Sequence, residues 1–154
     1  MAFTLTSSAF ADGERIPARY TCEGEDASPA LAWSGAPEGT RSLALLCDDP
    51  DAPAGTWRHW AVFDIAAGAT HLEESYPTDA QVGRTRQAVN DFGRTGYGGP
   101  CPPPGHGTHH YHFRLLALGT EKLETGGAPR CPDVEAAARP HLLAEAELVG
   151  TYSR

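Results

Sequence analysis

Alternating hydrophobic and polar positions mark the first clear β-strand of the chain at residues 42–49. Successive side chains of a strand point to opposite faces, so residues two apart share a face. One face of this segment carries Leu43, Leu45, Cys47 and Asp49. The pattern predicts a strand whose inner face ends in a carboxylate.

The same alternation recurs at residues 57–65 and 109–118, each time with an imidazole at the start of the apolar face. The predicted inner faces are His59, Ala61, Phe63 and Ile65 in the first segment, and His109, Tyr111, Phe113, Leu115 and Ala117 in the second. His110, His112 and Arg114 are predicted to lie on the opposite, more polar face. Three predicted strands therefore present titratable groups at the ends of buried faces.

The last part of the chain predicts a short helix followed by a strand. Asp133 precedes a helix-forming run and is predicted to cap it, with Pro132 outside the helix and Pro140 ending or kinking it. Residues 144–152 alternate again and predict a half-exposed final strand. With 17 Gly and 13 Pro as turn signals and no linker, we predict one all-β domain over residues 1–154, with one or two peripheral helices.

Charge excludes one large class of function. Twenty acidic residues against 12 basic ones give a net charge of −8, which repels phosphate backbones, so no nucleic-acid partner is expected. The N-terminal sequence lacks the pattern of a secretory signal, and no window approaches the ~20 apolar residues of a membrane-spanning helix. We therefore expect a cytoplasmic protein.

The four cysteines are Cys22, Cys47, Cys101 and Cys131, which are far apart and form no C-x-x-C pair. In a reducing compartment such cysteines are most simply free thiols. The sequence therefore predicts no structural disulfide.

Two segments carry the chemistry. Asp49 and His59 flank a Pro- and Gly-containing loop, so a hairpin would make them neighbours, and the carboxylate would favour a protonated imidazole. Residues 96–113 form a stiff Gly/Pro-rich loop that leads into His109 and Tyr111. Backbone N–H groups at Gly98, Gly99, Gly105 or Gly107 are candidates for an anion-binding nest.

These segments resemble the two signature regions of the phosphatidylethanolamine-binding protein family. The resemblance rests on DPDAP at residues 49–53, on His59-Trp60, and on the loop that leads to His109-His110-Tyr111. SPALAW at residues 28–33, PEGTRSLAL at 37–45 and HLLAEAELVGTY at 141–152 are similar to the bacterial and archaeal branch. The sequence departs from animal members at Cys101, where their loop contains glycine.

The resemblance implies a Greek-key β-sandwich with a small cavity that accepts phosphate-like anions or phosphorylated head groups, without metal or cofactor. It also implies regulation of a partner protein, such as a kinase or protease, and a homodimer. The ligand-binding residues that it implies are Asp49, Ala52, Pro53, Trp57, His59, Gly99, Cys101, Pro102, Pro103, His109 and Tyr111.

Plainer roles and other chemistries compete with this hypothesis. Asp49 could cap the turn that follows it, and His59 or Tyr111 could simply pack in the core. His59, His109 and Asp49 also offer a metal-ligand set, with His106 nearby in sequence, whereas His106, His110 and His112 are otherwise expected to face solvent.

A hydrolase would use Cys101 beside His109, or Asp49 and His59 acting on water, but three prolines after Cys101 remove donors useful for an oxyanion. The sequence therefore predicts a non-enzymatic anion-binding protein, with a metal-dependent or Cys/His hydrolase as the alternative.

Overall fold

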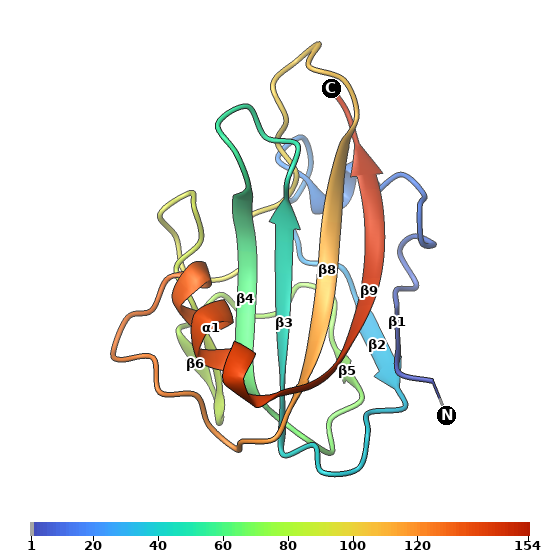
Figure 1. Ribbon diagram of the computed structural model, residues 1–154. Coiled ribbons are helices and arrows are strands. Elements are labelled where there is room, and N and C mark those ends of the chain that lie inside the picture. The colour runs from blue at the N-terminus through green and yellow to red at the C-terminus, as the bar shows by residue number, and fades with distance from the viewer. Residues whose placement is uncertain (1) are drawn as a thin grey trace.

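Two antiparallel β-sheets form the body of the protein in the computed structural model, which describes residues 2–154 (Figure 1). The smaller sheet has the order β1 (Thr4–Thr6), β2 (Leu31–Ser34) and β5 (His71–Leu72). The larger sheet has the order β6 (Gln81–Val82), β7 (Thr85–Gln87), β4 (Trp57–Ala66), β3 (Ser42–Asp49), β8 (His109–Leu118) and β9 (Leu142–Tyr152). The helical elements are the α-helix α1 (Cys131–Ala138) and the 3₁₀ turns η1 (Ala18–Tyr20) and η2 (Arg139–His141).

The larger sheet contains a Greek key. Strands β3, β4 and β7 lie side by side in chain order, and β8 returns across a long connection to pair with the free edge of β3. The resulting order of 8-3-4-7 is the Greek-key arrangement of four strands. Because neighbouring strands are antiparallel, the end of β3 and the starts of β4 and β8 lie at the same edge of the sheet.

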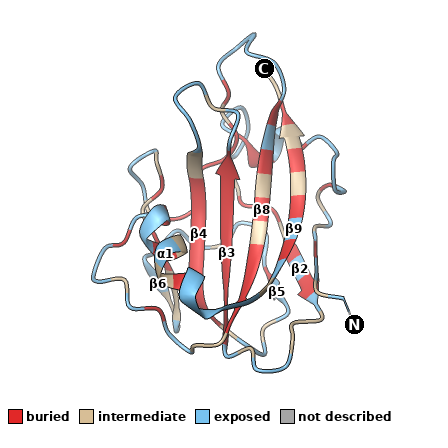
Figure 2. Cartoon of the chain, in the orientation of Figure 1, coloured by how far each residue is buried: buried red, intermediate tan, exposed pale blue. Residues whose placement is uncertain are grey.

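Strand β3 is central, and all eight of its residues are buried (Figure 2). Leu43, Leu45 and Cys47 face the core between the two sheets, as the alternation predicted. Ala44 and Leu46 face a second core, which α1 covers from the other side of the sheet. The larger sheet is therefore apolar on both faces, as expected for a layer enclosed between two others.

The predicted inner face of β4 is wrong, because two register shifts interrupt the alternation. Trp60 lies opposite Cys47 and Arg58 opposite Asp48, so His59 is an extra residue in the ladder. A second shift includes Asp64, whose φ is +56°. Such bulges re-aim the side chains that follow. As a result, Trp60, Val62 and Ile65 face the core between the sheets, and Ala61 and Phe63 face α1.

The short helix exists, but its predicted first turn is wrong. Helix α1 begins at Cys131, so Pro132 lies inside the first turn, where proline is tolerated. Asp133 is the third helical residue rather than the cap, and its carboxylate accepts the Arg130 N–H at 2.9 Å. Pro140 falls in η2, directly after the helix. Within residues 2–154 no helix has both the length and the apolar character needed to cross a membrane.

Charged side chains attach α1 to the larger sheet. Glu135 of the helix pairs with Arg58 at 2.6 Å and with Arg114 at 3.1 Å, and both arginines also pair with Asp48. These two arginines hold the pKa of Glu135 below its usual value despite the opposing effect of burial. The cluster occupies the face of the sheet opposite to that of Asp49.

We predict that Gly150→Ala destabilises the protein by about 1–3 kcal/mol, as overpacking of a core does. A Cβ atom at Gly150 would lie 2.5 Å from Ile16 Cγ1 and 2.8 Å from a Phe10 ring carbon. Gly68→Ala is the matched control, because its Cβ would meet nothing within 4 Å, and a change within about 0.5 kcal/mol is expected. Denaturant unfolding of both variants checks this, and equal midpoints would contradict it.

Candidate functional site

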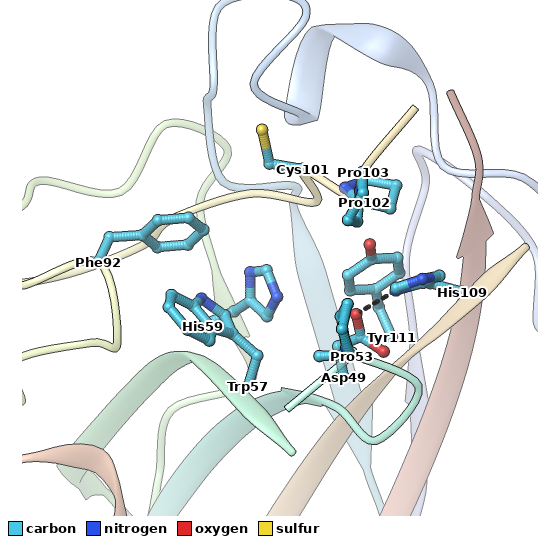
Figure 3. A pocket seen from close by; sticks show the side chains of 11 residues that line it. Asp49, Pro53, Trp57, His59, Phe92, Cys101, Pro102, Pro103, His109 and Tyr111 are labelled. Carbon is cyan, nitrogen blue, oxygen red and sulfur yellow. Dashed lines mark hydrogen bonds and ion pairs between the residues drawn. The ribbon is translucent and has the colours of Figure 1, made fainter. Parts of the chain in front are cut away.

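A cavity of about 190 Å³ opens where β3 ends and where β4 and β8 begin (Figure 3). Strand β3 supplies Asp49 from its last residue, and the loops before β4 and β8 close the sides. The lining residues are Asp49, Ala52, Pro53, Trp57, His59, Phe92, Cys101, Pro102, Pro103, His109 and Tyr111. Segments far apart in the sequence therefore meet at one edge of the sheet.

Ten of the eleven residues predicted from the sequence line this cavity. Gly99 does not, and its absence of a side chain has a packing reason. A Cβ atom there would lie 2.3 Å from the Tyr20 carbonyl oxygen and 2.5 Å from Asp26 Oδ1. Gly99 therefore allows the loop to approach the segment after η1.

Phe92 lines the cavity and was not predicted. The buried Asn90 side chain accepts the Phe92 N–H at 2.9 Å and the Arg94 N–H at 3.2 Å, which makes a tight turn. This turn holds the Phe92 ring at the rim, edge-on to Trp57 and to His59. The only signal in the sequence is an aromatic residue within the turn NDFG, which is too weak to assign it to a site.

Asp49 is paired with His109 and not with His59, which corrects the predicted hairpin pair. In the ladder Asp49 lies opposite Trp57, and the extra residue in β4 displaces His59. His109 Nδ1–H donates to Asp49 Oδ2 at 2.6 Å, with both side chains buried. The other carboxylate oxygen accepts the Asp51 N–H at 2.8 Å, so Asp49 also caps the following turn. Asp49 therefore caps this turn, as its plainer interpretation predicted, and also lines the cavity, while its role in ligand binding stays a prediction.

His106 contacts His109, although its own position is exposed. His106 Nδ1 and His109 Nε2 are 2.7 Å apart and share a hydrogen bond. His106 lies between Gly105 and Gly107, whose φ values are +76° and +97°. His106 is therefore exposed, as predicted, and its ring also contacts the buried imidazole of His109.

His110 and His112 point away from the cavity, as the sequence predicted. Asp51 Oδ2 accepts both the N–H and the Nδ1–H of His110 at 2.8 Å, and these bonds lower the Asp51 pKa. The pair attaches the loop between β3 and β4 to the start of β8. It thus fixes the wall that carries Ala52 and Pro53.

Burial favours the neutral form of His59, whereas the sequence led us to expect a protonated ring. Burial lowers its pKa below 6.5, and the hydrogen bond to Gly98 and the nearby carboxylates offset this only in part. Its Nδ1 lies 2.6 Å from the Gly98 carbonyl oxygen, which can only accept a hydrogen bond. The proton is therefore on Nδ1, and Nε2 carries a lone pair.

The Tyr111 hydroxyl is the only side-chain polar atom among residues 2–154 that is sealed from solvent and has no hydrogen-bond partner. Buried hydroxyls nearly always have one. Burial, reinforced by the charge of Asp49, raises the pKa of Tyr111, so the group keeps its proton. Its ring packs edge-on against His59, with centroids 5.2 Å apart (Figure 3). The hydroxyl is a donor in the cavity wall with nothing to donate to.

Three glycines proposed for an anion nest have their N–H groups engaged within the protein. The Gly98 N–H donates to His59 O at 3.0 Å, the Gly99 N–H to Asp26 Oδ1 at 2.8 Å, and the Gly105 N–H to Arg154 O at 3.0 Å. These bonds shape the loop over the cavity. For these three positions the nest hypothesis is wrong.

Cys22 and Cys101 form a disulfide, so the prediction of four free thiols is wrong. Their Cα atoms are 5.4 Å apart, although the residues are separated by 79 positions. The loop carrying Cys101 lies against the segment after η1, where the Cys22 N–H donates to Pro100 O at 3.1 Å. The disulfide therefore covalently ties the cavity wall to the N-terminal part of the chain.

The other two thiols, Cys47 and Cys131, are buried. Burial raises the pKa of Cys47 well above its usual value and that of Cys131 to about 12. Thiols of this kind are unreactive. Over residues 2–154, no three His, Cys, Asp or Glu side chains are grouped so as to hold a metal ion.

Comparison with known proteins gives consistent matches. A family model described as phosphatidylethanolamine-binding protein matches residues 6–153. A UPF0098 protein of Aquifex aeolicus is 47% identical over 148 residues, covering 96% of this chain and 86% of the relative. LppC of Mycobacterium tuberculosis, whose name suggests a lipoprotein, is 41% identical over 150 residues, covering 97% of this chain and 71% of the relative.

A solved structure matches the fold at full length. The crystal structure of Escherichia coli YbcL, described as a new member of the mammalian PEBP family, has a TM-score of 0.91 at 37% identity. The match covers 100% of this chain and 99% of YbcL. The all-β fold predicted from the sequence is confirmed.

We predict different stability effects for two tyrosine-to-phenylalanine changes. Tyr111→Phe removes an unpartnered hydroxyl and should leave the free energy of unfolding unchanged or raised. Tyr97→Phe removes the donor to the buried Tyr20 carbonyl at 2.7 Å and should cost about 1–3 kcal/mol. Denaturant unfolding of both variants tests this, and an equal loss in both would show that the Tyr111 hydroxyl has a partner.

His59 should make the protein less stable as pH falls below 6.5. Its pKa is lowered in the folded protein, so in this range the unfolded chain binds more protons and unfolding becomes easier. The His59→Gln variant lacks this titrating group, so His59 no longer contributes to the pH dependence of the unfolding free energy. The decrease in unfolding free energy between pH 7.5 and pH 5.5 should therefore be smaller in the variant than in wild type, and an equal decrease would contradict a neutral, buried His59.

Proposed function

The chain belongs to the phosphatidylethanolamine-binding protein family, and on this premise we propose that its cavity binds a small anion or a phosphorylated head group. The observation that carries the proposal is the buried Tyr111 hydroxyl, which has no partner within the protein. Leaving such a group unpaired costs stability. A ligand oxygen that reaches the hydroxyl, by displacing the side chains that seal it, would accept its hydrogen bond and remove that cost.

The size of the cavity supports a small ligand. The volume of about 190 Å³ leaves room for a phosphate-sized group together with bound water. Pockets for drug-sized molecules are larger, at roughly 300–1,000 Å³. Trp57, Phe92 and the prolines surround the polar groups with apolar surface, which strengthens hydrogen bonds to a charged ligand.

We propose that the cavity binds its ligand and does not catalyse a reaction. The disulfide leaves Cys101 without the thiol that a cysteine hydrolase requires. His109 is held by Asp49 as a general base would be, but His106 occupies the ring atom that would accept a proton from water. Both contacts favour a binding protein over the hydrolase alternative.

Two further roles stay predictions from the family. They are the regulation of a partner such as a kinase or protease, and the formation of a homodimer.

A cytoplasmic location also stays a prediction, and two observations weigh against it. The first is the Cys22–Cys101 disulfide, because disulfides persist mainly in oxidising compartments. Cys22 is exposed, so reductants in the cytoplasm would reach this bond. LppC, whose name suggests a lipoprotein, is 41% identical to this chain over 150 residues.

Titration with inorganic phosphate at pH 7.5 should shift the side-chain NMR signals of His59 and His109. Signals of His71 and His141, which lie outside the cavity, should not move. Tyr111→Phe should weaken phosphate binding roughly tenfold or more, because hydrogen bonds to charged groups contribute about 1.5–3 kcal/mol. An unchanged affinity in this variant, or no shift in any cavity histidine, would refute the proposal.

A further inference from the structure

We propose that the cavity selects an oxyanion that still carries a hydroxyl group, such as hydrogen phosphate, and rejects a fully deprotonated oxyanion of the same shape, such as sulfate. The inference rests on the proposed function, because it specifies which anions the same site accepts. The residue that makes the selection is His59, acting as a hydrogen-bond acceptor.

The orientation of the His59 proton is set by the backbone. The Nδ1 atom faces the Gly98 carbonyl oxygen at 2.6 Å, and the Gly98 N–H donates back to the His59 carbonyl at 3.0 Å. A carbonyl oxygen cannot donate, so Nδ1 must carry the hydrogen in either charge state of the ring. In the neutral ring, Nε2 is then an acceptor only.

The Nε2 atom is available to a ligand. No described residue makes a hydrogen bond to it, and Tyr111 Oη is the only sealed side-chain nitrogen or oxygen atom without a partner in residues 2–154. The Nε2 atom is therefore not sealed from solvent, and His59 is one of the residues that line the cavity. Figure 3 shows the His59 ring between Phe92 and Trp57 on one side and Tyr111 on the other.

The cavity thus offers one free donor beside one free acceptor. Tyr111 has an unpartnered O–H, which a ligand reaches when the side chains that seal it shift, and the adjacent His59 ring has a lone pair; the ring centroids are 5.2 Å apart. A phosphate group carrying a proton satisfies both, since one oxygen accepts from Tyr111 and its hydroxyl donates to Nε2. Sulfate has the same tetrahedral shape but no hydroxyl, so one of its oxygens would face the lone pair.

Asp49 increases the discrimination. Its carboxylate also lines the cavity and already accepts from His109 Nδ1 and from the Asp51 N–H. A second acceptor near the ligand repels an oxygen that has no hydrogen to donate. Asp49 and the His59 lone pair therefore both oppose a fully deprotonated dianion.

The test compares inorganic phosphate with sulfate at pH 7.5 and constant ionic strength, by calorimetry and by the histidine NMR signals. Phosphate carries at least one proton at this pH and sulfate carries none. We expect sulfate to bind roughly ten- to a hundredfold more weakly, because it leaves a buried acceptor unpaired. Equal affinities for the two anions would overturn the inference while leaving anion binding intact.

Failure of the proposed function looks different, because then neither anion would shift the signals of His59 or His109. His59→Gln replaces the acceptor by an amide that can also donate, so the ratio of phosphate to sulfate affinity should fall toward one. His112→Gln is the matched control, since His112 faces Glu147 on the other side of the sheet, and it should keep the wild-type ratio. An unchanged ratio in His59→Gln would show that His59 does not make the selection.

A third titration, with methyl phosphate at pH 6.0, distinguishes a free phosphate ion from a phosphate ester, such as a head group, as the ligand. At this pH a large share of the monoester still carries one proton. Binding with an affinity near that of phosphate would support an esterified ligand such as a head group. Binding of phosphate alone would support the free ion, and in both cases the discrimination against sulfate should remain.

Discussion

The pairing of β3 along both of its edges is the constraint on which the site depends. Its antiparallel neighbours β4 and β8 both begin where β3 ends, so Asp49 is placed between the starts of two strands. His59 and His109 are brought together in this way from positions 50 residues apart. The loops that precede β4 and β8 then have to cover the same edge, and they become the walls of the cavity (Figure 1).

The second constraint is the satisfaction of polar groups in the interior. Asp49, His109, Asn90 and Gln87 are buried and each is paired within the protein. Against this background an unpartnered Tyr111 hydroxyl beside an open His59 nitrogen is an exception. Exceptions to hydrogen-bond satisfaction are concentrated at functional sites, where the missing partner is supplied by a ligand.

The sequence predicts strands best where the alternation is uninterrupted. Strand β8 and the apolar face of β3 follow directly from side-chain period, since neither contains an extra residue on that face. The face of β4 could not be derived, because a bulge at His59 depends on pairing with β3 and leaves no local signal. That bulge also explains why Asp49 meets His109 and not His59.

The same distinction applies to the cavity. The family signatures identify ten of its lining residues, but the Cys22–Cys101 disulfide, the place of Phe92 and the neutral state of His59 arise from contacts between distant segments. Spacing along the chain carries no information about such contacts. Burial, which lowers the pKa of His59, becomes known only when the fold is known.

The most direct test of the account is a crystal structure of the protein with inorganic phosphate at pH 7.5. The account predicts one phosphate in the cavity, with one oxygen at hydrogen-bond distance from Tyr111 Oη and another from His59 Nε2. A cavity that contains only water, or a phosphate bound away from both atoms, would contradict it.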